Sequence, residues 1–120
     1  MKHLQNAIKD FKPCVIKHGL NEKGYLEIIK EFINVSDFIK LNSNEITFKI
    51  QDGVISENGV NGLQAIDLIK FSLELIKSLN QEFSCRENSL TITKLEEAIQ
   101  SQESRTTNRI FRNVEGTNNP

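Results

Sequence analysis

The clearest periodic pattern of apolar residues lies in the last third of the chain. The run from about Arg86 to Arg112 contains no glycine or proline, which predicts a helix of about seven turns with Ser84 or Asn88 as its N-cap. At ~100° per residue, one stripe of this helix consists of Asn88, Ile92, Leu95, Ile99, Gln102, Thr106 and Ile110. The stripe is apolar up to Ile99 and then turns polar, where a core helix would continue with leucine or isoleucine.

Three arginines border the polar end of this stripe. Arg105, Arg109 and Arg112 stand at i, i+4 and i+7, so they lie one above another on the helix. One interpretation is a solvated face, on which the arginines pair with the nearby glutamates at positions 96, 97 and 103. The other is an anion site, because guanidinium groups bind phosphate through paired hydrogen bonds and like charges one turn apart repel unless an anion separates them.

A second amphipathic helix is predicted from about Leu63 to Asn80. Its wide apolar face consists of Ala65 or Ile66, Ile69, Phe71, Leu73, Ile76 and Leu79. The connector to the last helix, residues 79 to 86, is too short for anything except an antiparallel helical hairpin. Phe83, its only aromatic residue, either plugs the end of the hairpin or forms a platform on which a purine stacks near Arg86 and Asn88.

The first half of the chain shows strand patterns. Apolar and polar residues alternate from Glu45 to Gln51, as in a half-buried strand, and Asp52-Gly53 then predicts a turn into a short returning strand at Val54-Ile55. Residues 14–18 and 24–32 predict a β-hairpin, although residues 25–39 also roughly fit the spacing of a helix. Residues 1–9 predict a short helix or a frayed arm that ends before Pro13.

These elements predict an α+β fold in which a small antiparallel N-terminal β-sheet packs on a long C-terminal two-helix hairpin. We expect one domain over residues 1–120, mostly β over 1–58 and helical over 59–112, followed by a tail over 113–120. The hairpin presents more apolar surface than a sheet of three or four strands can cover, and the chain contains no tryptophan. We therefore expect a homo-oligomer that buries the helical seam between copies.

The sequence GVNG at Gly59 to Gly62 opens onto the second helix. Its two glycines permit positive φ in a loop, which is the commoner reason to find them. Alternatively, a glycine-containing loop before a helix exposes backbone N–H groups that bind phosphate, and Asn61 adds an amide. No lysine follows, so the loop is not a P-loop.

Composition narrows the function classes. With 15 basic and 16 acidic side chains the formal net charge is −1, which disfavours general binding to DNA or RNA. We find no signal peptide or membrane-spanning run and expect a cytoplasmic protein in which Cys14 and Cys85 are free thiols. His3 and His18 have no cysteine or carboxylate at ligand spacing, so we expect no metal site, no catalytic residues and no cofactor.

Two segments carry a resemblance to a known family. CRENSLTITKLEEA, the three spaced arginines and VEGT in the last third, together with FKIQDGVISENGVNGLQ at residues 48–64, resemble small phage proteins of the Thoeris anti-defence 1 family. The resemblance covers roughly residues 46–117 and rests on these motifs in combination, because TKLEEA alone occurs in many helices and the anti-CBASS 2 sponges have a similar piece. The chain departs from the family pattern at three positions: family members have proline in place of Ser84, often an aromatic residue in place of Ser101, and glycine in place of Asn113.

The resemblance implies a function. Family members bind cyclic ADP-ribose isomers of the glycocyclic type and hold them uncleaved, so that the immune effector of the bacterial host is not activated; some also bind CBASS cyclic trinucleotides and assemble as hexamers built from dimers. It implies a pocket formed by Asn88, Arg105 and Arg109, together with Arg112 and Glu115. We add Phe83 and Arg86 to the residues of this pocket, because Phe83 could stack on a purine near Arg86. Asn61 and Gly62 would belong to a second nucleotide site or to assembly.

Three function classes therefore compete. A sponge that sequesters the signal predicts binding without turnover, which fits the absence of a recognisable base or metal site. An enzyme that degrades the same cyclic nucleotides needs such a group. A phage regulator that binds nucleic acid needs a basic surface, which the net charge disfavours.

Overall fold

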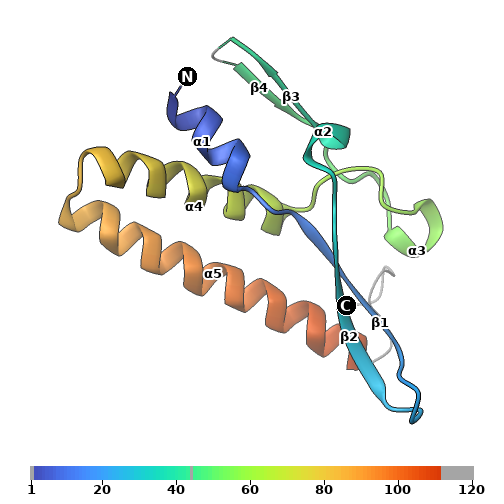
Figure 1. Cartoon of the computed structure of the whole chain (residues 1–120). Coiled ribbons are helices and arrows are strands. Elements are labelled where there is room, and N and C mark those ends of the chain that lie inside the picture. Colours follow the sequence, from blue (N-terminus) through green and yellow to red (C-terminus); the bar gives the residue numbers. More distant parts are fainter. Residues whose placement is uncertain (1, 44, 112–120) are drawn as a thin grey trace.

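A computed structural model describes residues 2–43 and 45–111, and it confirms an α+β fold organised on a long helical hairpin (Figure 1). Helix α4 spans Ala65–Glu82 and helix α5 spans Arg86–Phe111, and the two pack side by side in antiparallel orientation. Both helices agree with the prediction from local periodicity. Arg112, the predicted last residue of the second helix, lies outside the described residues.

The predicted N-terminal β-hairpin is confirmed. Strands β1, Cys14–Leu20, and β2, Leu26–Phe32, pair in antiparallel register with Cys14 opposite Phe32. The turn is fixed by Asn21, whose side-chain oxygen accepts hydrogen bonds from the backbone amides of Lys23 and Tyr25, both at 2.9 Å. The rival helix over residues 25–39 is wrong, because β1 supplies backbone partners along β2 and only a single turn, α2 at Val35–Phe38, is helical.

The predicted strand at 45–51 exists, but its partner differs from the expected one. Strand β4, Glu45–Phe48, pairs in antiparallel orientation with β3, Ile39–Asn42, which precedes it in the chain. The returning strand expected at Val54-Ile55 is wrong. Ile55 begins the short helix α3, Ile55–Asn58, because the amide of Asn58 donates to the carbonyl of Val54 at 2.9 Å and closes a helical turn.

The core lies between the N-terminal helix, the second sheet and the first half of α4. Helix α1, Lys2–Asp10, packs across α4. The ring of Phe71 on α4 meets the rings of Phe11 and Phe48 edge to face, with centroids 5.6 and 5.2 Å apart. Around these rings the buried residues are Ala7, Phe11, Ile39, Leu63 and Phe71. In the described residues the strands form two separate two-stranded sheets and not one larger sheet.

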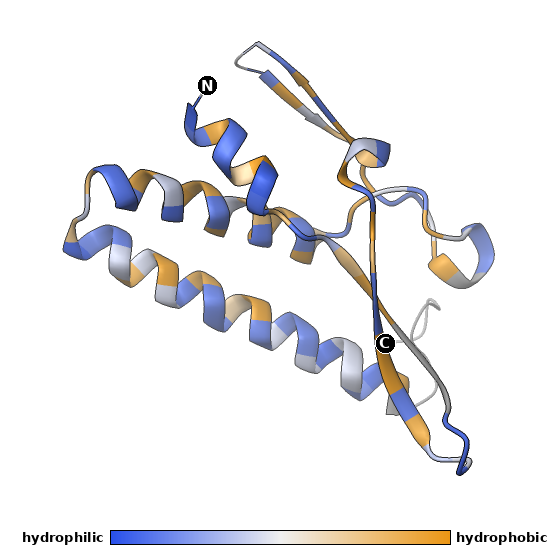
Figure 2. Cartoon of the chain, viewed as in Figure 1, coloured by the Kyte–Doolittle hydropathy of each residue, from blue (hydrophilic) through white to orange (hydrophobic). Residues whose placement is uncertain are grey.

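A large share of the apolar surface stays outside this core. Every residue of β2 is exposed, including Leu26, Ile28, Ile29 and Phe32. Figure 2 shows apolar and charged segments side by side along this strand, which lies away from the α1–α4 contact. At the opposite end of the hairpin, Leu79, Phe83 and Leu90 are also exposed. A single copy of the chain thus leaves apolar side chains in water at both ends of α5.

Candidate functional site

The first group of predicted site residues lies where α4 turns into α5. Phe83 is the C-cap of α4: its amide donates to the carbonyl of Leu79 at 2.9 Å, and its side chain is 71% exposed. This exposure contradicts the interpretation that Phe83 plugs the hairpin and leaves the ring accessible as a stacking surface. The connector thus presents an aromatic face to solvent.

Cys85 caps the start of α5 in place of the predicted Ser84 or Asn88. Its sulfur accepts from the amide of Asn88 at 3.4 Å, and its own amide donates to the Asn80 side-chain oxygen at 3.2 Å. Through these two contacts Cys85 ties the connector to Asn80 in α4 and to Asn88 in α5. Local sequence carries no signal for this role, because cysteine is not among the residues that usually cap helices.

Arg86 and Asn88 do not point to the same place. Arg86 is exposed, whereas Asn88 is half-buried on the seam stripe of α5. Two successive steps of about 100° separate them around the helix axis. A ligand that touches Asn88 along the seam therefore has to extend around the helix, or meet a second chain, before it reaches the guanidinium of Arg86.

The second group lies near the other end of α5. Arg105 is exposed, but Arg109 is only 5% exposed and has interaction partners within the protein. The predicted seam is confirmed beside them, since Gln102 and Thr106 are half-buried and Ile110 is buried. Arg112 and Glu115 lie outside the described residues. Hence the arginine edge expected from the spacing contains one accessible and one buried guanidinium in the part that the structure describes.

Two of the three glutamates considered as partners for the arginines have other partners. The Glu103 carboxylate lies 3.3 Å from the ammonium of Lys30 on β2, and the Glu97 carboxylate lies 3.8 Å from that of Lys94. The Glu103 contact also places β2 beside the C-terminal half of α5. Lysines therefore share two of the three glutamates that the solvated-face interpretation assigned to the arginines.

One chain does not bring the two groups together. Asn88 and Arg105 are 17 positions apart on one continuous helix, which corresponds to about 25 Å at 1.5 Å per residue. A small nucleotide bound to one chain therefore does not reach both groups. An antiparallel arrangement of two copies of α5 would place the connector of one copy beside the arginines of the other.

The GVNG loop is held by hydrogen bonds between Asn61 and the preceding segment at residues 51 and 52. The Asn61 side chain accepts from the amide of Asp52 at 2.8 Å and donates to the carbonyl of the same residue at 2.9 Å. Gly59 has a φ of 67°, as the loop interpretation expects, but Gly62 is required for a different reason. A Cβ there would lie 2.5 Å from the Gln51 nitrogen, so the glycine permits a close backbone approach.

The start of α4 already contains a carboxylate. Asp67 is fully buried in the first turn, and its Oδ2 accepts from the amide of Gln64 at 2.9 Å. Burial raises the pKa of Asp67, and the Gln64 amide, the Lys70 ammonium and the Cys14 amide oppose this shift without reversing it. A carboxylate at this position competes with any phosphate for the N–H groups at the start of α4, which disfavours the alternative interpretation of the GVNG loop as a phosphate site.

Asp67 should make stability depend on pH in a specific direction. Because its pKa in the folded state lies above the ordinary 3.8, the native state binds this proton more tightly than the unfolded state. Its favourable contribution is complete below that ordinary value and is lost as pH rises through the folded-state pKa. We expect Asp67→Asn to gain stability relative to the parent between pH 4 and pH 7, measured by urea denaturation. A gap between the two proteins that stays constant would contradict this, and exposed Asp10→Asn is the control.

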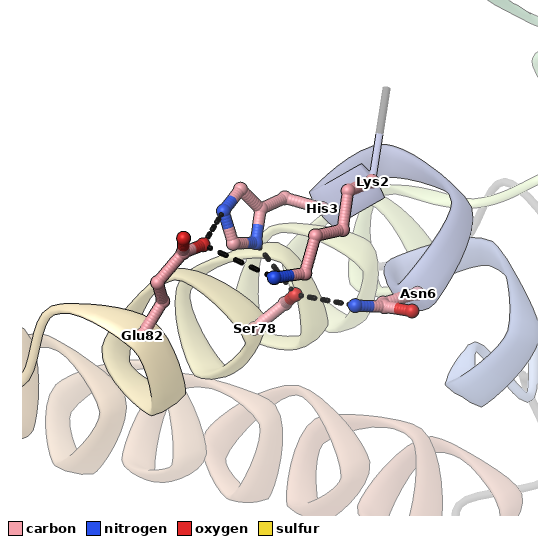
Figure 3. Close-up of polar contacts among 5 residues, drawn as sticks. All are labelled: Lys2, His3, Asn6, Ser78 and Glu82. Atoms are coloured by element: carbon pink, nitrogen blue, oxygen red, sulfur yellow. Dashed lines mark hydrogen bonds and ion pairs between the residues drawn. The ribbon is translucent and has the colours of Figure 1, made fainter.

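A polar cluster between α1 and α4 goes beyond what the sequence patterns predict. Figure 3 shows His3 between two side chains of α4: its Nε2 lies 2.7 Å from a carboxylate oxygen of Glu82, and its Nδ1 lies 2.9 Å from the hydroxyl of Ser78. Asn6 donates to the same hydroxyl at 3.2 Å, and the Lys2 ammonium lies 3.5 Å from Glu82. More than 70 positions separate these partners in the sequence, so no local pattern reveals them.

Metal and membrane chemistry find no support in the described residues. Within them, no three histidine, cysteine, aspartate or glutamate side chains gather in a way that would hold a metal ion. None of the described helices is long and apolar enough to cross a membrane.

Comparison with known proteins gives two matches. Residues 42–107 match the model of the Acb2/Tad1 hairpin domain, and this segment includes the connector, most of α5 and Arg105. Over 72 residues the chain is 44% identical to a protein of Bacillus phage SBSphiJ7 named "Thoeris anti-defense 1", an alignment that covers 59% of this chain. The matched part spans about half of the relative, 51% of its length.

Proposed function

Because the chain belongs to the Acb2/Tad1 hairpin-domain family, we propose that it is a phage anti-defence protein that binds cyclic ADP-ribose-type immune signals, glycocyclic isomers among them, and sequesters them without cleavage. The observation that supports this most directly is the relative named for Thoeris anti-defence, at 44% identity. The family match also includes residues that we assign to the ligand, namely Phe83, Arg86, Asn88 and Arg105.

The chemistry of these residues suits a cyclic nucleotide that contains a diphosphate. The exposed ring of Phe83 offers a stacking surface for a base, and the exposed guanidinium groups of Arg86 and Arg105 offer paired donors to phosphate oxygens. The amide of Asn88 can recognise hydroxyl groups of a ribose or the edge of a base. Together these groups recognise the parts of the ligand without supplying a nucleophile.

We further propose that the site forms between two copies of the chain in a homo-oligomer. The separation of about 25 Å along α5 leaves the connector and the arginines too far apart for one small ligand. The exposed apolar residues of β2 and of the connector end lie beside these two groups. Association of two antiparallel copies would cover apolar surface and complete the site together.

Cyclic trinucleotides are a second ligand class to be tested. Asn61 and Gly62 are occupied in holding the GVNG loop against residues 50–52, and Asp67 sits at the start of the following helix. We therefore assign these residues to the architecture, and any binding of cyclic trinucleotides should be located by experiment on other surfaces.

Ligand recovery tests the sponge proposal against signal degradation. The purified protein is incubated with a stoichiometric amount of a cyclic ADP-ribose isomer, the unbound ligand is removed, and the protein is denatured by heat. We expect mass spectrometry to return the unmodified isomer. Recovery of a linear or hydrolysed product would identify an enzyme, and failure to retain any ligand would refute the proposed function.

Phe83→Leu should weaken nucleotide binding while the fold is preserved. Stacking of a base on an aromatic ring contributes about 1–3 kcal/mol, so we expect a loss in the lower half of that range for an aliphatic replacement. The secondary structure should be unchanged because the ring is exposed in the single chain. Titration calorimetry measures the affinity, with Tyr25→Leu as a matched control, since Tyr25 is similarly exposed at the turn of the N-terminal hairpin. Equal affinity of Phe83→Leu and the parent would remove Phe83 from the site.

A further inference from the structure

The polar cluster of Figure 3 lies at the end of α4 that leads into the connector. Glu82 is the last residue of α4, and Phe83 follows it directly. The Glu82 carboxylate is held by Lys2 and His3 of α1. On the other side of Phe83, the Cys85 amide is held by the side chain of Asn80. The backbone around the exposed aromatic ring is therefore fixed from both directions.

From this arrangement we propose that His3 is a positioning residue for the nucleotide site: by binding Glu82, it fixes the end of α4 from which Phe83 projects. The consequence for binding rests on the proposed function, whereas the consequence for the connector does not. His3 precedes the segment that matches the family model, residues 42–107. The His3–Glu82 contact thus joins the N-terminal segment of this chain to the helical hairpin that matches the family model.

The hydrogen bonds of His3 can be kept in both protonation states of its ring. A carboxylate only accepts hydrogen bonds, so Nε2 must bear a hydrogen and donate to Glu82. In the neutral ring Nδ1 then accepts from the Ser78 hydroxyl, and in the charged ring it donates to the same oxygen. Only the direction of the Ser78 bond changes. A neutral amide at the right position should therefore replace either half of the contact.

The two contacts of His3 predict different effects. The bond to Ser78 holds α1 on the body of α4, where Ser78 is buried and also bonded to Asn6. The bond to Glu82 acts on the residue next to Phe83. A residue that only secures α1 would depend on both bonds alike. A positioning residue requires the Glu82 bond in particular.

Two substitutions separate the contacts. The amide nitrogen of glutamine reaches approximately the place of Nε2, so His3→Gln keeps the bond to Glu82 and loses the bond to Ser78. The amide of asparagine reaches approximately the place of Nδ1, so His3→Asn does the reverse. We expect His3→Asn to weaken binding of a cyclic ADP-ribose isomer roughly three- to tenfold, the scale of one hydrogen bond. His3→Gln should stay within about twofold of the parent on the same scale.

Amide hydrogen exchange without nucleotide gives an independent readout. The amides of Phe83 and Cys85 should exchange faster in His3→Asn than in His3→Gln, because the end of α4 opens more often when Glu82 keeps only its longer contact with Lys2. The Leu63 amide, bonded to the carbonyl of Lys49 at 2.8 Å in the core, is the internal control and should be unchanged in both.

Each outcome decides a separate question. Equal exchange and equal affinity in both variants and the parent would overturn the positioning role. Equal losses in both variants would also overturn it, since His3 would then only secure α1. If the parent binds no cyclic ADP-ribose isomer, the proposed function fails, and the exchange of Phe83 and Cys85 still decides whether His3 fixes the connector.

Discussion

Gly62→Ala should destabilise the protein by about 3 kcal/mol or more, with little effect on the secondary structure of the helical hairpin. A Cβ at this position would lie 2.5 Å from the backbone nitrogen of Gln51 and 2.6 Å from the carbonyl oxygen of Ile50. Backbone atoms cannot rotate away as a side chain can. The two segments must separate, or the alanine must distort the loop that enters α4.

The hydrogen bonds beside Gly62 explain why separation is costly. The Leu63 amide donates to the carbonyl of Lys49, and the Gln51 amide donates to the carbonyl of Leu63, both at 2.8 Å. These bonds hold fully buried Leu63 in the core beside Phe71. Moving the loop by the distance that a methyl group requires would break both bonds and withdraw Leu63 from its neighbours.

Urea denaturation measures this effect, and Gly59→Ala is the matched control in the same loop. Gly59 has a φ of 67°, and nothing lies within 4 Å of the place that a methyl group would occupy, so alanine there meets backbone strain alone. That strain costs about 1–3 kcal/mol, because with a ψ of −176° the backbone lies in a region that glycine almost alone adopts. Similar losses at both positions would contradict the close-approach explanation, as would a Gly62→Ala protein of parental stability.

The helical hairpin could be predicted because its signal is local. Periodic apolar residues and the absence of glycine and proline define α5 from residues that are all neighbours in the sequence. The expected boundaries of α4 were off by two residues at each end, since Gln64 takes the N-cap position and Glu82 extends the last turn. Helix ends depend on single caps, which are weaker signals than periodicity.

The strands show the limit of such patterns. Alternation identifies β4, but it cannot say which segment pairs with it. The turn at Asp52-Gly53 favoured a following partner, whereas the chain uses the preceding segment β3 and places α3 after the turn. Strand pairing is decided by contacts between segments, here by Ile39 and Phe48 packing against the core around Phe71.

The candidate site was only partly visible in the sequence for a related reason. Spacing places Arg105 and Arg109 on one edge of α5, but it cannot tell that one is exposed and the other buried. Burial depends on what packs against that edge. The contact between His3 and Glu82 joins α1 to the end of α4, and nothing in either segment alone predicts the partner.

The unequal burial of the two arginines decides which substitution tests the ligand site. Arg109→Ala should lower both affinity and stability, because removing a buried side chain with partners leaves unpaired groups and a void. A loss of binding in that variant would therefore be ambiguous. Arg105 is exposed, so its removal should leave the fold of the isolated chain intact.

Arg105→Ala should weaken binding of a cyclic ADP-ribose isomer by about 2 kcal/mol or more, which is the scale of a charge-assisted, two-pronged contact to phosphate. Its thermal unfolding without ligand should match that of the parent, because an exposed guanidinium contributes little to stability. Arg105→Lys should recover only part of the affinity, since an ammonium cannot form the paired hydrogen bonds of a guanidinium.

The matched control is Lys94→Ala, which removes an exposed cation from the same helix and only a surface pair with Glu97. Calorimetry should give this variant the affinity of the parent. If Arg105→Ala and Lys94→Ala both bind like the parent, the arginine edge is a solvated face, and the proposed site loses the phosphate contact on which it depends. If both weaken binding equally and the loss shrinks at high salt, the ligand is attracted by general charge and not by a site at Arg105.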